Sequence, residues 1–258
     1  MVVSDTAIIS LIGTYLWPLF RILGMFSIAP VLGARLVPMR VRLLLAVAIT
    51  CVIAPALPPF SPQTLDAPNV LFTGAQQMLI GVSMGFVMRM AFAALELGAH
   101  IIALQMGLGF ASLLDPQGGV QVPTLSQFYI MVGTLMFLAL NGHFLLLQLL
   151  FDSFRLLPIG PVGLDRDSLH AVALWGGEMF RGAVLVALSA TVALVSVNIL
   201  TGVMTRAVPQ FNMFVAFPAI LLLGYIIIAI NLSSLEQQLG QLLDSALYTV
   251  RNDILRTN

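Results

Sequence analysis

The sequence predicts an all-α, membrane-class protein made of broken and hairpin helices. Of its 258 residues, 59% are hydrophobic and 9% are charged, and the mean hydropathy of +1.02 is far above that of soluble domains. Because an interrupted helix survives in a membrane only inside protein or against water, we expect much of the chain to be covered by other subunits or to line an aqueous path. Five prolines interrupt or border the apolar segments: Pro18, Pro30, Pro55, Pro209 and Pro218.

The apolar segments, each of roughly the 20 residues that cross a bilayer, predict six or seven crossings. We expect the third and fourth segments to form a hairpin that turns near Arg89, which gives seven. Arg35, Arg40 and Arg42 flank the first loop, so the positive-inside rule places this loop in the cytoplasm and the N-terminus outside. In chain order the segments are Ala7–Gly33, Val41–Pro59, Val70–Met88, Leu97–Leu114, Thr124–Phe151, Ala171–Met204 and Phe211–Leu232.

Composition and motifs exclude several functional classes. The eleven basic residues are all arginines and balance eleven acids, so the surplus of positive charge that nucleic-acid binding needs is missing. The single cysteine, Cys51, can form neither an internal disulfide nor a zinc cluster. The sequence has no zinc-protease helix, phosphate-binding glycine loop or nucleophile elbow. We therefore expect no catalytic residues, no metal site and no cofactor.

The segment GLGFASLLDPQGGVQVPTLSQF, from Gly107 to Phe128, is glycine-rich although it lies between two apolar blocks. Its glycines allow turns that other residues avoid, its apolar side chains can dewet a constriction, and its acid before proline favours a turn or an extended chain. Two interpretations stay open, an ordinary connecting loop and a segment that blocks a pore. The residues concerned are Gly107, Gly109, Phe110, Leu113, Leu114, Asp115, Pro116, Gly118 and Gly119.

Small and ionisable residues indicate where helices meet. The GVSMG motif of the third apolar segment has glycines four residues apart, which permit close helix approach. Glu96 and His100 are four residues apart, and Glu178 and Arg181 are three apart, so each pair can meet on one helix face. A charge inside a span costs a few kcal/mol and therefore faces protein or water. We expect both pairs at helix or subunit interfaces; a proton relay through Glu96 and His100 is the alternative.

The motif TRAVPQFN connects the last two apolar segments. In one interpretation it is a turn, in which Pro209 ends the preceding helix and Asn212 caps the next. Arg206, however, lies on the side of the membrane where positive charge is disfavoured. We therefore expect carbonyls or an acid of a neighbouring subunit to hold its guanidinium, and we assign Pro209, Gln210 and Asn212 to the same subunit interface.

The C-terminal stretch from Leu235 to Ile254 is predicted to be an amphipathic helix in the cytoplasm rather than a span. Arg251 and Arg256 are outnumbered by Glu236, Asp244 and Asp253, which argues against an anionic lipid surface as its partner. Docking to a partner protein and packing on the membrane or on its own chain both stay open. The leucines predicted to dock a partner are Leu235, Leu239, Leu243 and Leu247.

Several motifs resemble the FliR family of flagellar export-gate proteins, which has relatives in virulence type III secretion. The segment TGVMTRAVPQFNMFVAFP, Thr201–Pro218, contains the Arg-Ala-Val-Pro-Gln motif of that family. The stretches FRILGMFSIAPVLGARLVPMRVRLLLAVAI, GLGFASLLDPQGG and FLALNGHFLLLQLLFDSF are similar to it in the same order, so the resemblance spans nearly the whole chain. One departure is the absence here of the lysine that the family commonly has shortly after Phe217-Pro218.

The resemblance implies a core subunit of the flagellar type III export gate, present in single copy and joined to FliP and FliQ in a helical ring. It implies a fusion of two folds: a FliP-like part over 1–170, a FliQ-like hairpin over 171–232, and a cytoplasmic tail over 233–258 that meets FlhB. The location implied is the bacterial inner membrane, in lipid at the flagellar basal body. The substrates implied are unfolded exported proteins, with the segment 107–123 contributing a plug that keeps the channel closed to ions.

A small-molecule secondary transporter is the alternative of a different class. Such a protein needs a substrate site near the bilayer midplane and is usually built from two related halves. The sequence shows no internal repeat, and the linear resemblance to the FliR family favours the export gate. Purification separates the two, because a gate subunit is expected in a large assembly and a transporter in a small solute-binding oligomer.

Overall fold

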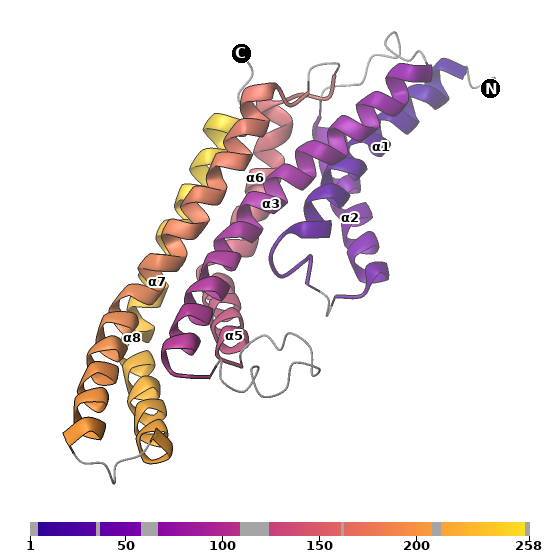
Figure 1. Ribbon diagram of the computed structural model, residues 1–258. Helices are drawn as coiled ribbons and strands as arrows, with labels where there is room; N and C mark the ends of the chain where they lie inside the picture. The colour runs from indigo at the N-terminus through magenta and orange to yellow at the C-terminus, as the bar shows by residue number, and fades with distance from the viewer. Residues whose placement is uncertain are drawn as a thin grey trace. The chain divides into compact units, whose positions relative to one another are not determined.

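The computed structural model describes residues 5–34, 37–57, 67–108, 124–160, 163–207 and 213–255, and these residues contain helices and no strand (Figure 1). The predicted all-α class is therefore confirmed. The α-helices are α1 (Asp5–Ile28), α2 (Met39–Ile53), α3 (Ala67–Gln105), α5 (Thr124–Ala139), α6 (Gly142–Leu156), α7 (Arg166–Ala207) and α8 (Met213–Thr249). A 3-10 turn, η1 (Ala54–Ala56), follows α2, and a π-helical turn, η3 (Val250–Ile254), follows α8.

The membrane class is confirmed by length and hydropathy. Four described helical segments are long and apolar enough to span a bilayer, and α5 with α6 adds a fifth if this pair is one broken span. The four segments are Met39–Ala56, Leu71–Gln105, Arg166–Ala207 and Pro218–Ile254.

The predicted hairpin at Arg89 is wrong. α3 runs without interruption for 39 residues, because the sequence MRMAFAALELGAH around Arg89 contains good helix formers and no turn signal. A single arginine does not interrupt the helix, and the predicted count of seven crossings is therefore wrong as well. The separation of the last span from the C-terminal helix fails too, since α8 continues through Leu232 to Thr249.

Proline and asparagine act differently along these helices. Pro18 lies inside α1 and Pro218 inside α8, so neither ends its helix. The predicted span Thr124–Phe151 is instead divided, because Asn141 has a left-handed backbone (φ 58°) and separates α5 from α6. Asparagine tolerates this conformation better than most residues. The broken helix is therefore confirmed here, at an asparagine rather than a proline.

The chain divides into two compact units. Unit 1 comprises Met1–Met90, Asn141–Gly176 and Asp244–Asn258, and unit 2 comprises Ala91–Leu140 and Gly177–Leu243. In unit 1, α1 packs on the first half of α3 with backbones nearly in contact. A Cβ on Gly85 would lie 2.7 Å from the Met25 carbonyl oxygen, and one on Gly24 would lie 2.5 Å from that of Met78. The close approach predicted from GVSMG is thus confirmed.

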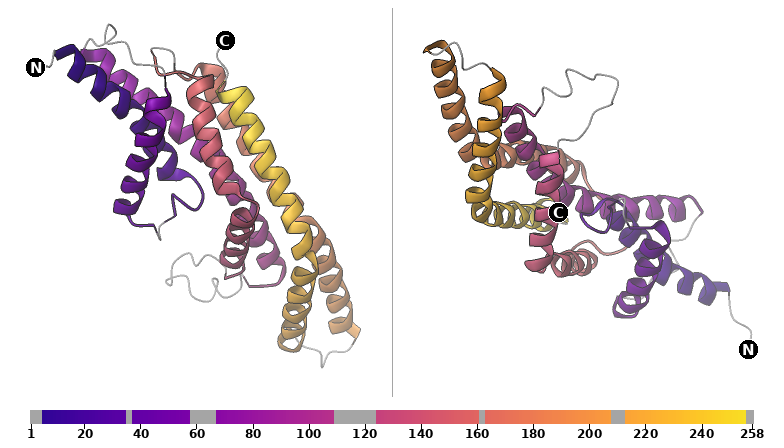
Figure 2. Two further views of the ribbon diagram at one scale, coloured as in Figure 1. Left: turned by 180° about the vertical axis from the view of Figure 1, so that it is seen from behind. Right: turned by 90° about the horizontal axis from the view of Figure 1, so that it is seen from below.

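In unit 2, α7 and α8 form a hairpin that packs on the second half of α3 (Figure 2). Gly98 of α3 lies against α7, where an added Cβ would be 2.8 Å from Val186 Cγ1. Gly182 of α7 lies against the Leu242 side chain of α8. Across the hairpin, the Ser189 hydroxyl donates to Asn231 Oδ1 at 2.7 Å. Small residues therefore set the helix spacing in both units.

Candidate functional site

The predicted pore segment leaves α3 through a defined turn. Gly107 has φ 78°, and its N–H donates to the Leu104 carbonyl at 3.0 Å, while the Leu108 N–H reaches back to the Ala103 carbonyl at 3.1 Å. This pair of bonds is the Schellman arrangement, in which glycine adopts the left-handed conformation that ends a helix. Gly107 is therefore required by the helix end. The other predicted plug residues lie outside the described residues: Gly109, Phe110, Leu113, Leu114, Asp115, Pro116, Gly118 and Gly119.

The last turn of α3, from which this segment departs, is held by both helices of the hairpin. The Asn198 side chain of α7 donates to the Gln105 carbonyl at 3.1 Å, which satisfies an acceptor that the helix end leaves free. Gly224 of α8 makes room for the buried Met106 side chain, whose Cε would lie 2.6 Å from an added Cβ. The stem of the segment is thus fixed within unit 2.

The helix that follows the segment, α5, contacts α3 at Glu96, some turns before the end of α3. The Ser126 hydroxyl, in the first turn of α5, donates to the Glu96 carbonyl at 3.2 Å. Ser126 and Tyr129 are both buried, and Phe137 farther along α5 packs edge-on against Phe92 of α3 with ring centroids 5.5 Å apart. Both ends of the segment 107–123 are therefore anchored on packed helices of one unit.

Of the two predicted charge pairs, the structure joins one. Arg181 Nε lies 3.2 Å from Glu178 Oε2, which confirms that these residues meet on one face of α7. Their side chains are 70% and 42% exposed, so the pair lies on the surface of the chain. Glu96 and His100 are half-buried on α3 and form no ion pair, which leaves the proton relay without a contact to support it.

Arg206 lies in the last turn of α7 with an exposed side chain, and it makes no hydrogen bond or ion pair with the described part of the chain. α7 ends at Ala207, two residues before Pro209 in the sequence. Pro209, Gln210 and Asn212 lie outside the described residues. The assignment of TRAVPQFN to a subunit interface stays a prediction.

The leucines assigned to partner docking are occupied by the chain itself. Leu235, Leu239 and Leu243 are buried in unit 2, and Leu247 is half-buried. Packing on its own chain, which the amphipathic pattern left open, therefore describes this face of α8 in the structure. The pattern located the apolar face correctly, but it could not say which surface covers it. Docking of a partner through these leucines stays a prediction and would require the face to separate from its present contacts.

Arg21 is a buried charged residue whose partners could not be predicted from the sequence. Its guanidinium is fully buried and lies 4.4 Å from the centroid of the Phe154 ring. Nε donates to Gln77 Oε1 at 2.8 Å, while Nη1 and Nη2 donate to the carbonyls of Ser153 and Leu157 at 2.8 and 2.9 Å. Both carbonyls lie at the C-terminal end of α6, where a cation is favourable, and that of Ser153 also accepts from the Leu157 N–H at 2.9 Å. Hydropathy flags such an arginine but cannot identify a partner 132 residues away.

Within the described ranges, no three His, Cys, Asp or Glu side chains gather in a way that would hold a metal ion.

Residues 12–246 match the model of the family described as bacterial export proteins, family 1. The chain belongs to this family. Curated FliR relatives named "Flagellar biosynthetic protein FliR" align over most of it. The FliR relative from Escherichia coli (strain K12) is 39% identical over 226 residues, which cover 86% of this chain and 85% of the relative.

Two further FliR relatives come from separate organisms. The relative from Pectobacterium carotovorum subsp. carotovorum is 36% identical over 83% of this chain and 82% of its own length. The relative from Aquifex aeolicus (strain VF5) is 30% identical over 90% of this chain and 88% of its own length. The FliR resemblance seen in the sequence is therefore confirmed, and this FliR-family chain is a membrane component of the flagellar export apparatus.

Proposed function

We propose that this chain is a core subunit of the flagellar type III protein export gate, where it forms with FliP and FliQ the channel for unfolded flagellar substrates. Membership of the FliR family supports a place for this chain in the flagellar export apparatus. The observation that supports assembly with other subunits is the apolar surface of the long helices, most of which the chain itself leaves uncovered. Only 28% of the most apolar window of α7 and 17% of that of α8 is buried within the chain. Surfaces of this extent call for lipid or partner subunits.

The mixture of residues on that surface favours partner subunits for much of it. α7 exposes the charged pair Glu178–Arg181, and the exposed Ser189 bonds Asn231 across the hairpin. Lipid offers nothing to such groups, whereas protein interfaces in membranes use polar and small residues. In this proposal Glu178, Arg181 and Arg206 face FliP or FliQ in the bacterial inner membrane at the flagellar basal body.

The proposal includes a plug and an order of parts along the chain. The segment 107–123 blocks the channel at rest, and the anchored stem at Gln105–Gly107 gives it a fixed base. Residues 1–170 form the FliP-like part, residues 171–232 the FliQ-like hairpin, and residues 233–258 the tail that meets FlhB. Docking of FlhB through Leu235, Leu239, Leu243 and Leu247 would require this covered face of α8 to separate from its present contacts. The exposed side of the tail, which carries Glu236, Gln237 and Gln241, offers FlhB a contact without that change.

Co-expression with FliP and FliQ tests the assembly. The three proteins are extracted in mild detergent, and the mass of the purified particle is measured by native mass spectrometry. We expect one copy of this chain in a particle with several copies of both partners, and poor recovery when the chain is expressed alone. A stable small oligomer that ignores FliP and FliQ but binds a solute would favour the transporter alternative.

A further inference from the structure

The C-terminal end of α8 changes its helical form where it packs into unit 1. Residues Val250–Ile254 form a π-helical turn, in which the Leu255 N–H donates to the Val250 carbonyl five residues earlier, at 3.0 Å. Val250, Ile254 and Leu255 are all buried. Isolated π turns are rare and often lie at functional sites.

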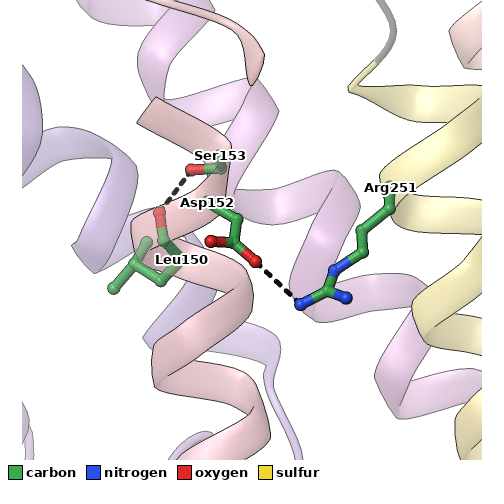
Figure 3. A network of polar contacts seen from close by, with 4 residues as sticks. All are labelled: Leu150, Asp152, Ser153 and Arg251. Carbon is green, nitrogen blue, oxygen red and sulfur yellow. Dashed lines mark hydrogen bonds and ion pairs between the residues drawn. The ribbon is translucent and has the colours of Figure 1, made fainter. Parts of the chain in front are cut away.

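Two contacts hold this turn. Arg251 Nη2 lies 2.7 Å from Asp152 Oδ2 on α6, and Figure 3 shows the two side chains reaching toward each other from separate helices. The buried Ser168 hydroxyl, in the first turn of α7, donates to the Ile254 carbonyl at 3.0 Å. The Ser168 N–H in turn donates to Asp165 Oδ1 at 2.7 Å, which fixes this first turn. The last turn of the described chain is therefore fastened to both α6 and α7.

The part of α6 that binds Arg251 is held by several hydrogen bonds. Ser153, the residue after Asp152, accepts from the buried Arg21 through both its carbonyl and its hydroxyl, and its hydroxyl donates to the Leu150 carbonyl at 2.6 Å (Figure 3). Asp152 is the single acidic residue of α6, so this helix offers Arg251 no other carboxylate to bind. The Arg251 and Asp152 side chains remain 40% and 27% exposed. Water can reach the pair, which makes it a contact that can open and close.

We propose that Arg251 and Asp152 form a latch that fastens the C-terminal turn to α6. When the latch opens, the turn at 250–255 loosens while the buried body of α8 stays in place. The latch is a property of the chain's own fold and does not depend on the export-gate assignment. In the closed state Arg251 holds the turn 250–255 on α6, and in the open state the Ser168 hydrogen bond and the burial of Val250, Ile254 and Leu255 are what keep it in place.

Hydrogen–deuterium exchange of the full chain, purified in mild detergent, tests the latch. We expect Arg251→Met and Asp152→Asn each to speed exchange of the amides at 250–255 by roughly two- to fivefold, the range for a partly exposed ion pair. Two matched variants serve as controls. Asn252→Ala changes an exposed neighbour of Arg251, and Arg155→Met removes an exposed arginine of α6 that only stacks on Phe151; both should leave the exchange unchanged.

Charge reversal tests whether the contact is direct. Asp152→Arg and Arg251→Asp should each loosen the turn, and the double variant should restore slow exchange. The latch would be overturned if the double variant exchanged as fast as the less affected of the two charge-reversed single variants. It would also be overturned if Arg251→Met and Asp152→Asn both left the exchange rate at 250–255 unchanged. If the charge-reversed variants do not accumulate in cells, the salt dependence of exchange in the unmodified chain tests the latch instead. Raising salt from about 0.1 M to about 1 M shortens the screening length from ~10 Å to ~3 Å. Exchange at 250–255 must then accelerate, while exchange in α3 must not.

Discussion

Arg21 binds two helix-end carbonyls and a glutamine from a fully buried position. We expect Arg21→Met to lower the free energy of unfolding by about 3 kcal/mol, because Gln77 Oε1 and the Leu157 carbonyl lose a charged donor. Arg21→Lys should recover only part of this loss, since an ammonium cannot reproduce the planar fork. Thermal unfolding in detergent measures the effect. The exposed Arg40→Met is the control, and an equal loss there would contradict the assignment.

Arg206 is the opposite case, an exposed arginine with no contact to the described part of its own chain. If a neighbouring subunit binds it, Arg206→Ala should leave the unfolding of the chain unchanged and reduce the yield of the complex with FliP and FliQ. A surface arginine such as Arg155 should show no such loss when replaced by alanine. Normal complex yield and normal flagellar export in the Arg206 variant would exclude the interface.

At the scale of the element, the contact of α1 with α3 depends on backbone proximity. A Cβ on Gly81 would lie 2.8 Å from the Met25 nitrogen, whereas one on Gly177 of α7 would meet nothing within 4 Å. Gly81→Ala should therefore destabilise the chain by about 2 kcal/mol, through forced separation of two packed helices. Gly177→Ala should be neutral or stabilising by up to about 1 kcal/mol, because alanine favours a helix. Denaturant titration distinguishes them; equal effects would contradict the close contact.

The segment 107–123 belongs to the same scale. Deleting Gly107–Gly119 should raise ion leakage through the assembled gate, because the segment combines glycines with an apolar centre that can exclude water. Single-channel conductance of the purified complex in planar bilayers measures the leak. A deletion that leaves conductance unchanged in an intact complex would show that the segment is an ordinary connection.

The apolar face of α8 gives a further prediction for an element. Leu239 is fully buried within unit 2, so Leu239→Asp should destabilise the chain by about 3 kcal/mol or more, as an unpaired charge in an apolar core does. Gln241→Arg, on the exposed side, should keep stability and weaken only a contact with FlhB. Unfolding curves together with co-purification separate the two effects. Unchanged stability in the Leu239 variant would show that this face is free after all.

At the scale of the whole molecule, helix length exceeds membrane thickness. α7 and α8 have 42 and 37 residues, or about 63 and 56 Å at 1.5 Å per residue, against a hydrocarbon core of about 30 Å. Residues 182–205 of α7 and 213–235 of α8 carry no charge, and both adjoin the tip of the hairpin. The charged stretches of both helices lie at the other end. Each helix is therefore longer than the hydrocarbon core is thick, and its uncharged part alone has the length of a span.

The amino-acid sequence alone determined the class, the family and the periodic faces of this protein. Hydropathy is a local property, so the apolar segments and the amphipathic face of Leu235–Ile254 were readable, as were the FliR motifs. The sequence was a poorer guide to where helices continue or break. The positive-inside rule wrongly placed a turn at Arg89, and no pattern predicted the break at Asn141, because both positions depend on single residues whose neighbours give weak signals.

Only the tertiary structure decided which parts of the chain pack on each buried side chain and on each apolar helix face. The partners of Arg21 lie 56 to 136 residues away, and the partner of Arg251 lies 99 residues away. No local pattern encodes such distances, because a buried donor is satisfied by whichever carbonyl the fold brings near it. The same holds for the leucines of α8, whose pattern predicts burial without naming the covering surface. On α8 the buried Leu242 lies against Gly182 of α7, which leaves room for its side chain.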